Sequence, residues 1–141
     1  MKRIFIVTFL VSTLASFSQS DKIIGEYFLE LGNEKHQIEY RLNLHSDGTF
    51  EFHSYVNSKK TMPPIVHKYG KGTWNLDDKV VTFVTSKERD LDEKHTLDFS
   101  GSKARFITKP SRDKTKRVIK TRLKFFESEI FWIDGLEIFK T

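Results

Sequence analysis

Apolar and polar residues alternate with a period of two over most of the chain that follows Asp21, in short runs separated by turn residues. Successive side chains of a β-strand point to opposite faces of a sheet, so this period places the apolar residues of each run on one face. The spacing of three and four residues that indicates an amphipathic helix is almost absent. The sequence therefore predicts an all-β protein whose antiparallel sheet buries one face.

Turn residues and the matching of apolar faces predict how the strands pair. Around Gly48 only a three-residue loop pairs apolar residues with one another, Leu44 with Phe50. A shift of one residue would expose the whole apolar set, so this register is strongly preferred. By the same reasoning a two-residue turn between the next two strands pairs Trp74 with Phe83.

A third hairpin is expected about Gly101-Ser102, where it would pair Phe99 with Ala104 and Leu97 with Phe106. The apolar residues on both sides of this turn again match when the loop has two residues. We therefore expect the strands 96–100 and 103–109 to be neighbours in the sheet.

Three other segments complete the predicted order. Residues Asn57–His67 contain two prolines, which lack an amide donor, and are expected to form a long exposed loop. Val118–Phe126 is expected to be one long strand, and Glu129–Ile133 a strand that returns beside it. With local connections throughout, about eight to ten strands form an up-and-down meander that closes into a barrel, because closure removes exposed edges.

The first twenty residues have the pattern of a signal peptide. Lys2 and Arg3 precede the apolar run Ile4–Leu14, and small residues follow it. The run is shorter than the roughly 20 apolar residues of a membrane span, although an uncleaved anchor is the alternative. We expect residues 1–20 to be removed and residues 21–141 to form one exported domain, periplasmic or extracellular. The chain has no cysteine, so we expect no lipid anchor.

Three short motifs resemble the bacterial lipocalin-like, or calycin-type, secreted domains. They are Gly25-x-Tyr27 in the first strand, Asp47-Gly48-Thr49-Phe50 in the first hairpin and Gly72-Thr73-Trp74 before the middle hairpin. Their order and spacing resemble those domains over most of the chain after the leader. The resemblance implies a small barrel and an apolar ligand, and it implies no reaction.

The predicted interior is the first candidate site, because aromatic side chains dominate its inward positions. A barrel of about eight strands either fills itself with side chains or holds one small ligand. So many bulky rings favour filling, and a ligand cavity is the alternative. The candidate ligand-contacting residues are Tyr27, Tyr40, Phe52, Trp74, Phe83 and Phe106.

The second candidate is a basic surface, since residues 103–124 contain ten basic side chains and one acid. Strand alternation places many of these cations on the outside of two strands, where such a stripe attracts polyanions or anionic lipid. Ordinary solubility, with neutralisation by nearby acids, is the alternative. The candidate residues for an anionic partner are Arg105, Lys109, Arg112, Lys114, Lys116, Arg117, Lys120, Arg122 and Lys124.

No motif points to catalysis, a cofactor or a metal. His45 and His53 would lie on the outer face but too far apart to share an ion. The Ser100-to-Lys103 spacing matches a serine nucleophile motif, but a hairpin turn is the wrong context for it. We expect a non-enzymatic exported protein that binds a small apolar ligand. The alternative is an envelope module that binds an anionic partner, with nucleic acid not expected.

Overall fold

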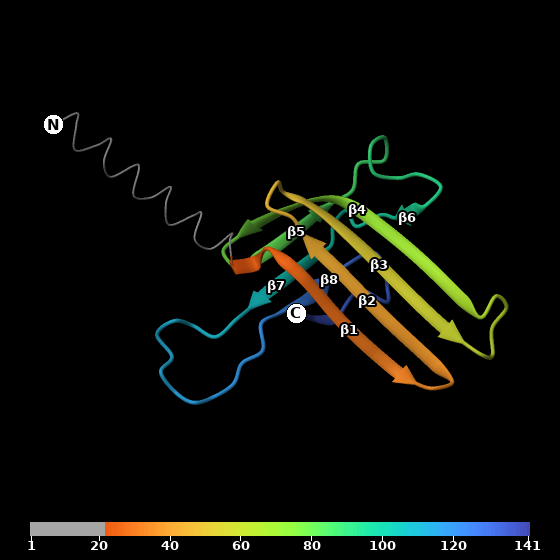
Figure 1. Cartoon of the computed structure of the whole chain (residues 1–141). Helices are drawn as coiled ribbons and strands as arrows, with labels where there is room; N and C mark the ends of the chain where they lie inside the picture. Colours follow the sequence, from red (N-terminus) through yellow and green to blue (C-terminus); the bar gives the residue numbers. More distant parts are fainter. Residues whose placement is uncertain (1–21) are drawn as a thin grey trace.

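The computed structural model describes residues 22–141, which form an antiparallel β-barrel (Figure 1). The predicted signal peptide, residues 1–20, lies outside the described residues. In the described part of the chain, no helix has the length and apolarity needed to span a membrane. The strands are β1 (Gly25–Asn33), β2 (His36–Leu44), β3 (Thr49–Ser58), β4 (Ile65–Asp77), β5 (Val80–Val84), β6 (His95–Leu97), β7 (Lys103–Ile107), β8 (Arg122–Glu127) and β9 (Glu137–Lys140).

Eight of the nine strands in residues 22–141 form a closed ring in the order β3-β2-β1-β9-β8-β7-β5-β4, and the β3–β4 ladder closes it. Strands that are neighbours in the ring also follow one another along the chain, with β6 left out. The one exception is the pairing of the last strand, β9, with the first, β1. The predicted closed meander is therefore confirmed, and its shape is consistent with the lipocalin-like fold that the motifs implied. The remaining strand, β6, pairs in parallel with β4 beside the ring.

The first two predicted hairpin registers are confirmed. Leu44 lies opposite Phe50, and Trp74 lies opposite Phe83. In the second hairpin the two turn residues, Asp78 and Lys79, have φ angles of 44° and 66°. Two positive φ angles in succession define the type I′ turn, whose twist matches that of the flanking strands.

The third predicted hairpin is wrong. Strand β7 pairs with β5 and β8, so Ala104 lies opposite Val81 and Phe125 instead of Phe99. The segment before it is held by Thr85, whose hydroxyl accepts a hydrogen bond from the Phe99 amide at 2.9 Å. Face matching could not detect this arrangement, because it compares only strands that are adjacent in the sequence.

Three other segment predictions need correction. The long loop expected at Asn57–His67 is shorter than predicted, since β3 ends at Ser58, β4 begins at Ile65, and the two strands pair as far as Asn57 opposite Ile65. Both prolines fall in the remaining turn, where no ladder donor is required. Strand β8 begins at Arg122 rather than Val118, and 129–133 forms turns instead of a strand.

The core is one connected set of aromatic rings. Phe50 packs edge-on against Phe83, with ring centroids 5.0 Å apart, and against Phe99 at 5.3 Å. Phe99 also packs on Phe52 at 5.0 Å, and Phe83 stacks on Phe125 at 5.4 Å. All five rings are buried, so rings from β3, β5, β8 and the segment before β7 meet inside the barrel.

We predict that Phe50→Ala lowers the free energy of unfolding by about 3–5 kcal/mol, the range for large aromatic side chains in cores. Phe50 is 1% exposed, and its truncation would leave a void between Phe83 and Phe99. Urea unfolding measures the loss. Phe131→Ala is the control because that ring is 86% exposed, and its effect should stay within roughly 0.5 kcal/mol. Equal effects of the two variants would contradict the packing.

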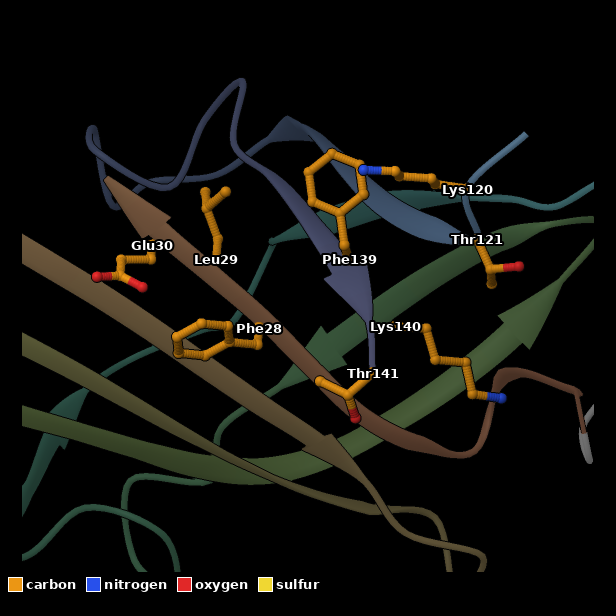
Figure 2. A pocket seen from close by; sticks show the side chains of 8 residues that line it. All are labelled: Phe28, Leu29, Glu30, Lys120, Thr121, Phe139, Lys140 and Thr141. Carbon is orange, nitrogen blue, oxygen red and sulfur yellow. The ribbon is translucent and has the colours of Figure 1, made fainter. Parts of the chain in front are cut away.

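The seam that closes the barrel is short. Strands β1 and β9 pair only as Tyr27 with Lys140 and Phe28 with Phe139, and then diverge (Figure 2). Continuing that register would place Glu30 directly opposite Glu137, both on the outer face. Like charges directly opposite each other destabilise an antiparallel pair. The ladder ends two residues before this position, at Phe28 opposite Phe139.

Glu30→Lys should stabilise the barrel by roughly 0.2–1 kcal/mol, the range for an opposite-charge cross-strand pair. The new ammonium would face Glu137 across the seam and Glu39 across the β1–β2 ladder, where two carboxylates now face each other. Thermal unfolding at low salt is the measurement. Glu34→Lys makes the same charge change in the exposed β1–β2 turn and should have little effect. A loss of stability in Glu30→Lys would contradict the repulsion argument.

Candidate functional site

The candidate ligand residues of the interior contact one another or the core. Tyr27 is fully buried, and its hydroxyl donates a 2.6 Å hydrogen bond to the Ile23 carbonyl. Burial raises the pKa of Tyr27 well above its usual range. Phe52 packs on Phe99, and Phe106 belongs to the buried core. Side chains that would line a ligand cavity are therefore packed together along the barrel interior.

Trp74 and Tyr40, the other two aromatic candidates, contact residues outside the central ring cluster. Trp74 is only partly buried, and its indole N–H donates to the His45 carbonyl at 3.1 Å. Tyr40 stacks on Trp132 with ring centroids 5.6 Å apart, and Trp132 also approaches Phe52 at 6.0 Å. The turn segment 129–136 thus packs Trp132 against the aromatic residues of β2 and β3.

Sequence reasoning missed this role of Trp132. Residues 130–133 are all apolar, so alternation could not assign a face to any of them. The structure buries Ile133, partly buries Trp132 and leaves Phe131 exposed. A turn explains that pattern, because neighbouring side chains there need not alternate between two faces.

Three of the nine basic candidates lie in β7 and β8, and the other six lie in the connection between these two strands. Arg105 lies directly opposite Lys124, and Ile107 lies opposite Arg122. The inner positions between them, Phe106 and Leu123, are buried. The predicted outward orientation of these cations therefore agrees with the pairing. Lys120 precedes β8 instead of belonging to it, but its side chain is exposed as well.

Carboxylates neutralise only part of this basic face. Glu137 of β9 pairs with Arg122 Nε at 3.2 Å and with Lys124 Nζ at 3.7 Å. Asp113 pairs with Arg117 at 2.8 Å. Within residues 22–141, no carboxylate lies within ion-pair distance of six of the nine candidates. These six are Arg105, Lys109, Arg112, Lys114, Lys116 and Lys120.

The long connection between β7 and β8 carries most of these unneutralised cations, and Asp113 organises it. The Asp113 carboxylate accepts hydrogen bonds from the Thr115 hydroxyl at 2.6 Å and from the Thr115 amide at 2.9 Å. These bonds and the Arg117 guanidinium hold the pKa of Asp113 below its usual range. Lys109 Nζ donates to the Thr115 carbonyl across the loop. Local bonding thus shapes a loop that projects from the barrel (Figure 1).

A groove of about 640 Å³ adjoins the basic face at the open seam. Figure 2 shows Phe28 and Glu30 of β1 on one side of it and Phe139 of β9 on the other. The ammonium of Lys120 lies 5.9 Å from the centre of the Phe139 ring. The groove therefore combines an apolar wall with a cation from the basic loop.

A second cluster, on the outer face of β3 and β4, was not predicted. His53 Nε2 and His67 Nδ1 are 2.8 Å apart, and the His53 ring stacks on Tyr69 with centroids 4.5 Å apart. The sequence placed His67 in a loop, so the contact could not be found. The alternation of residues 65–70, which matches β3, was the available signal.

We predict that His53 makes the stability of the protein sensitive to mildly acidic pH. Partial burial, then the neighbouring His67 and Arg41, lower its pKa below the ordinary 6.5. The unfolded chain therefore binds a proton more readily, so stability is full above pH 6.5 and falls as pH drops through the folded-state pKa. His53→Gln should flatten unfolding free energy between about pH 7 and 5.

Urea unfolding at several pH values measures this effect, with His36→Gln as the exposed control. The pKa values of four aspartates are lowered from 3.8, so their titration affects stability at a more acidic pH than that of His53. These are Asp47, Asp90, Asp92 and Asp113. Identical slopes for wild type and His53→Gln in the mildly acidic range would contradict the prediction.

Among residues 22–141, no three histidine or acidic side chains come together as a set that could hold a metal ion. Comparison with family models, curated proteins and solved structures finds no match to this chain.

Proposed function

We propose that this chain is an exported, non-enzymatic, lipocalin-like protein of the calycin type that binds an anionic partner through its basic face. The observation that carries the proposal is the Arg105–Lys124 pair, two like charges directly opposite across the β7–β8 ladder. Glu137 offsets part of the repulsion by pairing with Lys124 at 3.7 Å, but within residues 22–141 no carboxylate lies within ion-pair distance of Arg105. Uncharged polar residues on this solvated face would avoid the remaining cost. Binding of an anion would offset that repulsion.

The distribution of charge supports the same proposal. The basic face and loop hold nine candidate cations, and the carboxylates of Glu137 and Asp113 are the two that pair with them. Acidic side chains gather instead on the outer faces of β1 to β3, as Glu26, Glu30, Glu39 and Glu51. An asymmetric charge distribution of this kind steers an anionic partner towards one side of the molecule.

A small apolar ligand ranks second. The contacts among Phe52, Phe83 and Phe99 occupy the interior that such a ligand would use. The specific observation in its favour lies at one end of the barrel, where Trp132 stacks on Tyr40 beside the exposed Phe131.

Retention on a heparin column tests the proposal. We expect the variant Arg105→Gln, Lys120→Gln, Lys124→Gln to elute at clearly lower salt than wild type, because exposed charges act through a screened Coulomb attraction. The matched control removes three exposed cations elsewhere, Lys59→Gln, Lys60→Gln and Lys87→Gln. The control should elute close to wild type. Equal losses in the two variants would show only a response to net charge and would overturn the proposed site.

A further inference from the structure

We propose that the anionic partner is the surface of a lipid bilayer that contains anionic phospholipid. This inference rests on the proposed function and names the kind of partner that the basic face fits. The proposed lipid-contacting surface adds two apolar residues, Val118 and Phe126, to the cations of the basic face. Both are exposed on the same segment of chain as the cations.

The observation is a row of outward side chains along residues 118–126. Val118 is 85% exposed and Phe126 is 45% exposed. Between them, at every second residue, lie Lys120, Arg122 and Lys124. Of the intervening side chains, Ile119 and Thr121 are partly buried, and Leu123 and Phe125 are fully buried in the core. Arg122, Lys124 and Phe126 thus share the outer face of β8, and the exposed Lys120 and Val118 continue the row along the segment that leads into this strand.

Exposed apolar side chains within a basic surface fit a bilayer better than a soluble polyanion. Cations attract the anionic headgroups, and apolar side chains gain free energy by entering the boundary between headgroups and acyl chains. A polyanionic chain in water offers no apolar phase, so it would leave Val118 as exposed as before. The Arg105 guanidinium, 5.8 Å from the centre of the Phe126 ring, joins charge and apolar surface on the neighbouring strand.

The rest of the surface favours one orientation. The acidic side chains of β1 to β3 would be repelled by an anionic bilayer. The turn between β3 and β4 lies at the other end of the barrel from the basic loop (Figure 1), and it contains Met62, whose side chain is 94% exposed. The molecule would therefore approach with β7, β8 and their connecting loop towards the lipid.

Glu137 offers a test in which binding increases. Its carboxylate pairs with both Arg122 and Lys124. Glu137→Gln leaves the row intact and frees these two cations, so affinity for anionic vesicles should rise, by roughly fivefold for each charge made available. A structural role for Glu137 alone would not raise affinity for a lipid surface.

The experiment is co-sedimentation of the purified protein with vesicles of phosphatidylcholine and phosphatidylglycerol, and with phosphatidylcholine vesicles alone. Wild type should bind the mixed vesicles and not the neutral ones. Val118→Ser should weaken vesicle binding up to tenfold or so, as expected for an apolar side chain withdrawn from water. It should leave retention on heparin unchanged, and Met62→Ser should change neither measurement.

Three outcomes would overturn the inference. Retention on heparin without vesicle binding would remove the bilayer and leave the anionic partner standing. Vesicle binding that is equal for wild type and Val118→Ser, and is abolished completely by salt, would show attraction by charge alone. Failure to bind either heparin or vesicles would overturn the proposed function together with the inference.

Discussion

The packing of aromatic rings inside the barrel is the interaction on which the rest of the structure depends. Strand β4 contributes glycine at two inward positions, and the rings need that space. A Cβ atom at Gly70 would lie 2.7 Å from the Phe99 ring, and one at Gly72 would lie 2.1 Å from the Val84 carbonyl oxygen and 3.0 Å from the Phe50 ring. With no disulfide available, burial of these rings must supply most of the stability. It also fixes which side chains of every strand face outward.

Once the inward set is fixed, the outer face determines how well the ring closes. Glu137 would meet Glu30 if β9 continued to pair with β1, and it contacts Arg122 and Lys124 of β8 instead. Glu137 is therefore bound to cations of β8 and does not pair across the β1–β9 seam. The groove beside Phe28 and Phe139 therefore lies next to the basic face.

Alternation and turn chemistry are enough to predict hairpins formed by neighbouring strands, as the registers of Leu44 with Phe50 and Trp74 with Phe83 show. Local rules fail where the pairing is not local. Strand β6 runs parallel to β4, and its position depends on Thr85 hydrogen bonds that the sequence does not reveal. They fail again where apolar residues are consecutive, so the packing of Trp132 was missed. The alternation of side chains along a strand was enough to predict that the cations of β7 and β8 face outward. Their counterion Glu137 could be identified only from the β8–β9 register.

Solubility alone does not account for the outer face of β7 and β8. A solvated strand needs polar side chains, and threonine or glutamine would meet that need without placing Arg105 opposite Lys124. Solubility also gives no reason to leave Val118 and Phe126 in water at the ends of the same row. Cations that repel one another and apolar groups that remain wet are both unfavourable in the isolated barrel. Contact with a negatively charged surface that also offers an apolar phase would relieve both costs at once.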